Sequence, residues 1–283
     1  MKKIVCMLLA ALFAAVPLAA CSPAAGEEDT LPPAAESPEV PAPETPELPS
    51  EPSVPVAPDP EPAPEPDPEP EVLMAQYVYV LRDGLNVRSG AGTQYSAVGQ
   101  ADKDELYHYI RRTGDWYETY YQNKKAYLSA NGTYTTIASL ESAEDAVEDV
   151  IEEGLRLLGV PYVYGAVRLH DGKGNFLTNF TIRQFDCSSL MQYIFYQGAG
   201  ILLNTTTRTQ VTQGREVKDA LRRGDLMFFT NAQRYYKTGI ERVGHVALYL
   251  GKNYILHTAS DYAKIEQISA QRWKYYLSAR RFF

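Results

Sequence analysis

The sequence holds very little cysteine and histidine. Its three cysteines are Cys6, Cys21 and Cys187, and the first two lie close to the N-terminus. The rest of the chain therefore has no second thiol for an intrachain disulfide, and its folded part must depend on a hydrophobic core. His245 and His257 are not accompanied by a further histidine, cysteine or acid at zinc-ligand distances, and one cysteine cannot build a structural site, so we expect no metal site and no cofactor.

Residues 22–71 lack lysine and arginine altogether. They hold seventeen of the nineteen prolines and fourteen aspartates or glutamates. Such a segment cannot bury enough apolar surface to fold, and its alternating proline and acid favour an extended polyproline conformation. We predict a disordered linker over 21–72 that holds a folded part away from a surface, although a glycosylated or merely solubilising stalk would have the same composition.

The net charge of −8 conceals a basic folded part. Residues 22–71 contribute fourteen negative charges and Lys2 with Lys3 two positive ones, which leaves +4 for residues 72–283. A mildly basic surface suits an anionic polymer such as cell wall. Because no basic run carries a helix-turn-helix or RNA-binding signature, nucleic acid is not an expected partner.

The only long apolar run lies at residues 4–20, directly after the two lysines. It is short for a membrane span, which needs about 20 residues, and its layout is typical of a signal peptide over 1–20. The following Leu-Ala-Ala-Cys, which ends at Cys21, resembles the lipobox of bacterial lipoproteins and implies a lipid anchor on Cys21. An uncleaved anchor or an ordinary secretory signal is the alternative. Each places the protein outside the cytoplasm, and the lipobox attaches it to the bacterial membrane, facing the cell wall.

Short runs of alternating apolar residues recur between 76 and 137, separated by turn residues about every ten positions. This spacing predicts a small all-β barrel over 73–138. Its strings LNVRSG at 85–90 and GDWY at 114–117 resemble the bacterial SH3 (SH3b) domain. That resemblance implies an accessory domain that binds the wall or shapes the substrate site. Its tyrosines either fill the core or stack on sugar or peptide.

The pattern changes to a helical one after residue 139. Ser142 followed by Asp145 predicts a capped helix start, apolar residues recur at helical spacing from Val147 to Leu158, and Gly159 predicts the helix end. We therefore place the start of a second domain, 139–283, at this point.

Cys187 lies where a second helix should begin. Asp186 can cap that helix, Leu190 and Ile194 would form its buried stripe, and a glycine at 198 or 200 can end it. In the first turn of a helix the free backbone amides and the helix dipole favour a thiolate, which predicts a lowered pKa for Cys187.

A reactive thiol needs a base, and two of the four histidines are well placed to supply one. His108 lies in the other domain, and His170 lies in a glycine-rich stretch that is typical of a mobile loop. His245 and His257 lie on two strands of a predicted hairpin with a loop at 251–253. In that register their side chains share one face within reach of each other, so His245 can act as base while His257 orients it.

Five motifs together resemble the NlpC/P60 cysteine peptidases, in the order seen in that family. They cover residues 140–283 and read GVPYVYG at 159–165, DCS at 186–188, LRRGDLMFF at 221–229, GHVALYLG at 244–251 and LHTA at 256–259. The resemblance implies a papain-like α+β fold. It also implies hydrolysis of peptidoglycan stem peptides, typically between D-γ-glutamate and the following diamino acid.

The same resemblance implies the catalytic residues: Cys187 is the nucleophile, His245 the general base and acid, and His257 the third polar residue. It further implies substrate contacts. Tyr162 matches a family tyrosine that contacts substrate or the oxyanion, although packing beneath the helix is an equal use for it. Asp186 and Ser188 match positions that bind the free amine of the stem peptide in some members, while Asp186 can also serve as a helix cap.

The chain departs from the family pattern at several places. Ser189 replaces a glycine after the nucleophile motif, and the residues 166–185 and 231–242 are longer than usual. We expect these insertions to affect substrate preference more than activity.

Three functions are open at this stage. The first is a monomeric, lipid-anchored peptidoglycan or muropeptide endopeptidase. The second is a wall-binding lipoprotein with a weak or inactive peptidase domain. The third is an amidase or acyl transferase that uses the same cysteine and histidine.

Overall fold

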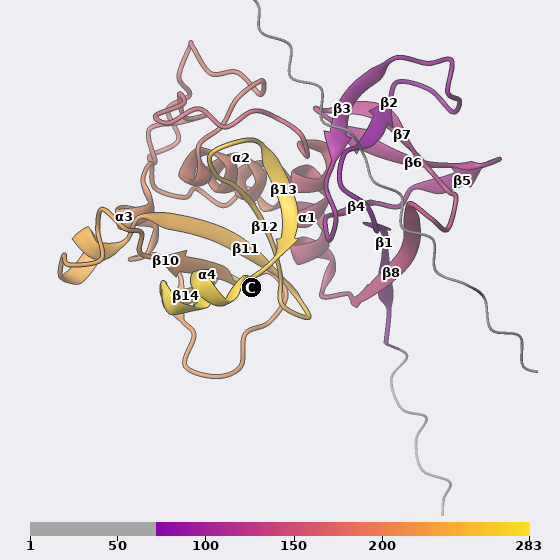
Figure 1. Ribbon diagram of the computed structural model, residues 1–283. Helices are drawn as coiled ribbons and strands as arrows, with labels where there is room; N and C mark the ends of the chain where they lie inside the picture. The colour runs from indigo at the N-terminus through magenta and orange to yellow at the C-terminus, as the bar shows by residue number, and fades with distance from the viewer. Residues whose placement is uncertain (1–71) are drawn as a thin grey trace, which may run out of the picture. The chain divides into compact units, whose positions relative to one another are not determined.

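A computed structural model describes residues 72–283. The predicted signal peptide, the lipidation site Cys21 and the proline-rich linker lie outside the described residues. Within 72–283 no helix has both the length and the apolar character needed to cross a membrane. The described fold is α+β, as predicted, with a β-rich N-terminal region followed by a mixed domain (Figure 1).

The N-terminal region is built from two antiparallel sheets, in the orders β4-β1-β8 and β3-β2-β7-β6-β5. The domain boundary expected at 138 falls inside β8, which pairs with β1 along its whole length. Tyr77 and Tyr107 are buried, so these two tyrosines belong to the core. The strands are β1 (Met74–Val80), β2 (Leu85–Arg88), β3 (Ala97–Ala101), β4 (Leu106–His108), β5 (Arg111–Thr113), β6 (Trp116–Tyr121), β7 (Lys124–Ser129) and β8 (Thr135–Glu141).

Helix α1 (Asp145–Arg156) begins later than the sequence predicted. Its N-cap is Glu144, and the expected cap, Ser142, was wrong. The backbone N–H of Ser142 donates instead to Leu73 O at 2.9 Å and so extends the β1–β8 pairing by one residue. The apolar stripe is buried as predicted, because α1 packs against the second helix of the domain.

The C-terminal domain is a six-stranded sheet in the order β13-β12-β11-β10-β14-β9, with α2 packed against β11 and β12 (Figure 1). A Cβ on Gly198 would lie 2.5 Å from the Val150 backbone, so the approach of α1 to α2 requires glycine there. The elements are α2 (Cys187–Ala199), α3 (Thr207–Gln210), β9 (Arg215–Glu216), β10 (Leu226–Phe229), η1 (Gly239–Arg242), β11 (His245–Gly251), β12 (Tyr254–Thr258), β13 (Ala263–Gln267), α4 (Ala270–Lys274) and β14 (Tyr276–Arg281).

The β11–β12 hairpin has the predicted register but a different turn. Leu248 pairs with Leu256, as expected, yet the pairing shifts by one residue at the end so that Gly251 faces Tyr254. The loop is therefore the two residues 252–253, both with positive φ, and the expected three-residue loop was wrong. Two residues with positive φ are what a tight hairpin turn requires, and the bulge at Gly251 absorbs the odd residue.

Hydrogen bonds also join the β-rich region to the C-terminal domain. The buried Glu105 carboxylate accepts from Tyr107 Oη at 2.9 Å and from Tyr262 Oη at 3.0 Å, and Lys264 Nζ lies 3.3 Å away. Burial raises the pKa of Glu105, while the hydrogen bonds and Lys264 oppose that rise. A buried carboxylate with this many donors is costly to disturb, so it ties β4 to the segment around β13.

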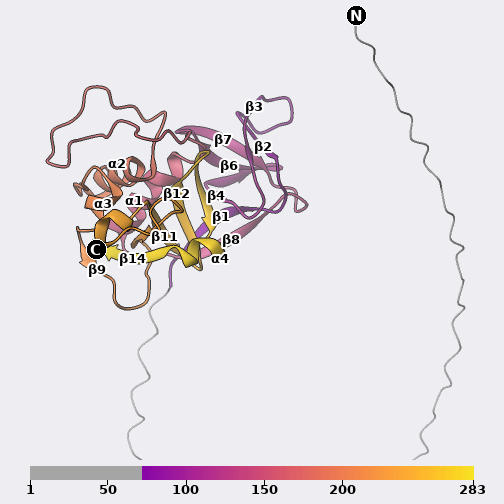
Figure 2. The ribbon, with the colours of Figure 1, turned by 60° about the vertical axis from the view of Figure 1, so that its left-hand side comes forward.

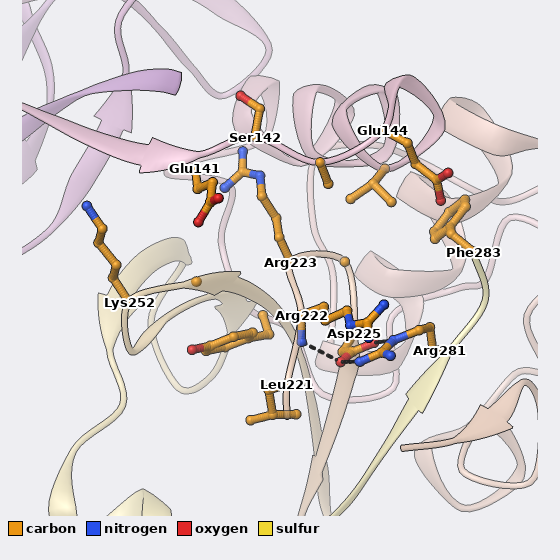
Figure 3. A pocket seen from close by; sticks show the side chains of 15 residues that line it. Glu141, Ser142, Glu144, Leu221, Arg222, Arg223, Asp225, Lys252, Arg281 and Phe283 are labelled. Atoms are coloured by element: carbon orange, nitrogen blue, oxygen red, sulfur yellow. Dashed lines mark hydrogen bonds and ion pairs between the residues drawn. The ribbon is translucent and has the colours of Figure 1, made fainter. Parts of the chain in front are cut away.

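A buried ion pair joins strands β10 and β14 of the six-stranded sheet. Arg281 donates through Nε and Nη2 to the two oxygens of Asp225, both at 2.7 Å, and the backbone N–H of Arg222 donates to the same carboxylate. The pair lines a cavity of about 700 Å³ (Figure 3). It anchors the last strand, β14, to the entry of β10.

We predict that Asp225→Ala lowers the free energy of unfolding by about 3 kcal/mol, because Arg281 loses both 2.7 Å hydrogen bonds to Asp225 and keeps only its longer contacts with Asp219 and Ala220 O. Urea unfolding followed by circular dichroism measures the change. Asp115→Ala is the matched control: it removes an exposed pair with Arg112, whose side chains are 96% and 56% exposed, and should cost about 1 kcal/mol or less. Equal losses in the two variants would contradict the assigned importance of the buried pair.

Candidate active site

Asp186 positions the nucleophile candidate by capping α2, as predicted. Its Oδ1 accepts from the Ser189 backbone N–H at 2.8 Å, and the Asp186 N–H donates to Ser189 Oγ, also at 2.8 Å. Ser189, which replaces the glycine of the family pattern, therefore completes a reciprocal cap. Cys187 becomes the first residue of the helix, and Leu190 is fully buried beneath it.

The Cys187 thiol is buried, with 9% of the residue exposed. Burial raises its pKa and the Asp186 charge raises it further, while the backbone N–H groups of Val246 and Ser188 and the charge of Arg168 lower it, with a net value of about 12. The prediction of a lowered pKa was wrong. The helix N-terminus favours a thiolate, but the loss of water around the sulfur outweighs it.

His245 and His257 lie on adjacent strands and contact each other directly, which confirms the contact that the predicted register implied. His245 Nε2 lies 3.1 Å from His257 Nδ1. The ring centroids are 5.1 Å apart and the planes are nearly perpendicular, at 82°. This arrangement joins the two imidazoles by one hydrogen bond.

Glu266 on β13 extends this line of hydrogen bonds, and sequence reasoning missed it. Its Oε1 lies 2.9 Å from His257 Nε2 and accepts from Arg272 Nη2 at 2.9 Å. Burial alone would raise the pKa of Glu266, but the hydrogen bond with His257 and the nearby cations lower it to about 2. The alternation of apolar and polar residues over 263–267 would have signalled strand β13.

The ionised Glu266 determines which nitrogen of each ring carries a proton. A carboxylate only accepts hydrogen bonds, so His257 must donate through Nε2–H and accept through Nδ1. His245 must then donate through its Nε2–H, which leaves its Nδ1 lone pair free to take a proton. Burial lowers the pKa of both histidines, so both rings are neutral at pH 7.

No hydrogen bond in residues 72–283 links the Cys187 thiol to His245. The sulfur lies instead against the backbone N–H of Val246, the residue that follows His245. The resting site therefore holds a neutral thiol on α2 and a neutral imidazole on β11, two elements that pack against each other. Such a pair can pass a proton from sulfur to nitrogen only as the sulfur attacks an electrophile.

A pocket of about 530 Å³ opens beside the sulfur and brings four of the predicted site residues together. Burial raises the pKa of Tyr162, and the nearby Cys187 adds to the rise. His245 and His257 are not among the residues that line the pocket, although Gly244 is, and His257 is 1% exposed. The pocket is lined by Tyr162, Tyr164, Gly165, Arg168, Asp186, Cys187, Ser188, Thr206, Thr207, Arg208, Asn231, Gln233, Arg234 and Gly244.

The two inserted segments, 166–185 and 231–242, both contribute to this pocket. The first contributes Arg168 and the second contributes Asn231, Gln233 and Arg234. His170 lies in the long loop between α1 and α2, as expected, but its side chain does not project into solvent. His170 is fully buried and its ring lies 5.6 Å from that of Tyr196 on α2. The contact between His170 and Tyr196 therefore holds the start of the glycine-rich stretch against α2.

Comparison with protein families decides what this domain is. The model of the NlpC/P60 family matches residues 159–281, the range that holds the thiol and both histidines. Residues 159–281 form an NlpC/P60 family domain. The bacterial SH3 domain model matches residues 83–133, within the β-rich region, so an SH3 domain precedes the NlpC/P60 domain.

Curated relatives of the NlpC/P60 domain include two bacterial hydrolases. The chain is 32% identical over 164 residues to a gamma-DL-glutamyl hydrolase of Bacillus subtilis, an alignment that spans 56% of this chain and 35% of the relative. It is 33% identical over 141 residues to the peptidoglycan endopeptidase RipB of Mycobacterium tuberculosis, which spans 48% and 54%. The chain thus covers about half of each relative or less. A solved RipB structure aligns with a TM-score of 0.37 at 28% identity, over 48% of this chain and 64% of that one.

The raised pKa of Cys187 predicts how the NlpC/P60 thiol reacts with iodoacetamide. Only the thiolate is nucleophilic, so the alkylation rate should rise about tenfold per pH unit from pH 6 to 9 without a plateau. Mass spectrometry of the peptide that carries Cys187 measures the rate. In protein unfolded by urea the rate should level off above pH about 9, because a free cysteine has a pKa of about 8.5. A plateau between pH 5 and 7 in the folded protein would instead indicate a thiolate–imidazolium pair.

Glu266 should control the protonation of both rings. We predict that nitrogen-15 NMR of the wild type shows His245 and His257 as Nε2–H tautomers. Glu266→Ala should give a mixture of tautomers at His257 and a still lower pKa, because the carboxylate is what raises that pKa against burial. Glu216→Ala, on the exposed strand β9 of the same sheet, is the control. An Nδ1–H tautomer at His257 in the wild type would contradict the proton arrangement.

Proposed function

We propose that the protein is a cysteine endopeptidase that hydrolyses the stem peptides of peptidoglycan or of muropeptides. The observation that carries the proposal is the contact between His245 and His257, together with a pocket lined by Cys187 and by Gly244, the residue before His245. The NlpC/P60 match and the names of the two relatives support the same activity.

The proposed reaction begins from the neutral thiol. As Cys187 Sγ attacks the scissile carbonyl carbon, its proton passes to His245 Nδ1, and an S–C bond forms. Collapse of the tetrahedral intermediate breaks the C–N bond, and His245 returns the proton to the leaving amine. Water then hydrolyses the thioester with His245 again as base. The backbone N–H of Cys187, at the start of α2, is a donor for the oxyanion.

His257 and Glu266 support this step without touching the substrate. Once His245 holds the extra proton, its Nε2–H donates to His257, which is itself oriented by Glu266. The negative charge of Glu266 then stabilises the imidazolium through one intervening ring. This matters because burial otherwise disfavours a charged His245.

We further propose that the bond cleaved is the one between D-γ-glutamate and the diamino acid. The name of the relative that is 32% identical, a gamma-DL-glutamyl hydrolase, supports a γ-glutamyl linkage. Tyr162, Asp186 and Ser188 line the pocket and are the proposed residues on the substrate side.

We also propose how the whole chain is arranged. Residues 1–20 serve as signal peptide, Cys21 carries the lipid, and 21–72 form the linker, followed by the SH3b domain at 73–138 and the peptidase domain at 139–283. The protein would then be held at the outer face of the bacterial membrane and act on the cell wall. The SH3b domain would bind the wall or shape the substrate site.

The test is incubation with defined muropeptides followed by mass spectrometry of the products. The wild type should release peptides that begin with the diamino acid, and Cys187→Ala and His245→Ala should each lower the rate by more than about a thousandfold. Urea midpoints close to wild type would show that both variants fold.

Other outcomes would replace the proposal. Binding of muropeptides without release by the wild type would favour the wall-binding function. Products cut at the amide next to the glycan, or products joined to an added acceptor, would favour an amidase or an acyl transferase.

A further inference from the structure

One arginine shares the carboxylate that orients the two histidines. Arg272 belongs to α4, the short helix that runs directly into β14 (Figure 2). Its Nη2 donates to Glu266 Oε1 at 2.9 Å, and His257 Nε2 lies at the same distance, 2.9 Å, from that same oxygen. A single carboxylate oxygen therefore binds a guanidinium and an imidazole together.

Arg272 is also fixed in place by contacts other than its ion pair. Its backbone N–H donates to Ser269 Oγ at 3.1 Å, the bond that caps α4. Its guanidinium carbon lies 5.9 Å from the centre of the Phe229 ring, and that ring is 6.0 Å from the ring of His245. Phe229 is 1% exposed, so water is excluded on this side of His245. The charge of Arg272 therefore acts on His245 across a ring of low polarity.

The other charged groups on the elements around the histidines are already paired or neutral. On β13, Lys264 Nζ lies 2.7 Å from the Asp261 carboxylate. At the start of α2, Asp186 is paired with Arg168 at 2.8 Å, and the Cys187 thiol is neutral. Strand β10, which pairs with β11, has only apolar side chains. The ion pair between α4 and β13 is therefore the electrostatic partner of the two rings.

The two members of that ion pair act on the rings in opposite directions. Burial lowers the pKa of both histidines. Glu266 raises the pKa of His257, while the charge of Arg272 lowers the pKa of His257 and of His245. Burial would raise the pKa of Glu266 itself, but the hydrogen bond with His257 and the charge of Arg272 hold it at about 2. Without Arg272 the carboxylate would be free to stabilise an imidazolium in the resting site.

We infer that Arg272 is a positioning residue that fixes Glu266 and keeps the His245–His257 pair unprotonated in mildly acidic solution, so that hydrolysis extends to lower pH. This inference rests on the proposed peptidase activity, because it assigns the pH range in which His245 can take the thiol proton. A cell wall is an anionic polymer and concentrates protons together with its other counter-ions. A base that stays neutral in such surroundings suits the proposed substrate.

The test is the pH dependence of kcat/KM for hydrolysis of a defined muropeptide by the full-length protein. Arg272→Met removes the cation, so the rings should take up a proton at a higher pH. The ratio of kcat/KM at about pH 5.5 to kcat/KM at about pH 8 should therefore fall by at least about threefold relative to the wild type. At about pH 8 the rings are neutral in both proteins, and kcat/KM should stay within about threefold of the wild type. An equal loss at both pH values would indicate a merely structural role and overturn the inference.

Further variants separate the charge of Arg272 from its hydrogen bond. Arg272→Lys keeps the charge and should restore most of the wild-type ratio, whereas Arg272→Gln keeps a donor without the charge and should behave like Arg272→Met. Lys274→Met is the matched control, since Lys274 is exposed on the same helix and its loss removes the same charge; it should keep the wild-type ratio. An unchanged ratio in a folded Arg272→Met, or an equal fall in Lys274→Met, contradicts the assignment.

A second measurement needs neither turnover nor a folded Arg272→Met. Nitrogen-15 NMR follows both rings of the full-length protein as the pH falls from about 8 to about 5. In the wild type both should remain neutral below the ordinary histidine pKa of 6.5, and in Arg272→Gln they should take up a proton at a higher pH than in the wild type. Identical titrations in the two proteins would overturn the role of Arg272. A wild type that cleaves no muropeptide would refute the proposed function, and this titration would still decide what Arg272 does.

Discussion

The contact between the first turn of α2 and the first residues of β11 is the constraint on which this site depends. It places the Cys187 sulfur against the backbone N–H of Val246, the residue after His245, and burial removes water from both the thiol and the His245 ring. The same burial that brings the two groups together raises the pKa of the thiol and lowers the pKa of the imidazole. Proximity and neutrality are therefore two results of one packing arrangement.

Because the Cys187 thiol and the His245 imidazole are neutral at rest, the charged groups around them have no resting ion pair to stabilise. If the thiolate were already formed, its stabilisation would be the main task of the site. Here charge appears only during attack, and the groups prepared for it are Glu266, reaching His245 through His257, and the N–H groups at the start of α2. Arg168 has a different role, because its guanidinium pairs with Asp186 and donates to Ser188, two residues that line the pocket.

Much of this arrangement was predictable because local patterns carry it. Asp186 before an apolar stripe predicts a capped helix, and a glycine-bounded strand followed by a second apolar run predicts a hairpin whose register brings His245 to His257. The structure differed from the prediction where contacts in the folded protein, rather than the local sequence pattern, set the backbone conformation. Ser142 reads as a cap but pairs with Leu73, and the turn of the hairpin closes on two residues because Gly251 forms a bulge.

The sequence by itself determined the α+β fold through the resemblance of its motifs to a known family, and it determined the order of the two domains, the cap on α2 and the meeting of the two histidines through periodicity, capping chemistry and strand register. Only the tertiary structure decided the protonation state of Cys187, the addition of Glu266 behind His257 and the pairing of Arg168 with Asp186. Desolvation depends on every atom packed around a group, and Arg168 and Glu266 reach the site from segments whose distance along the chain says nothing about their distance in space.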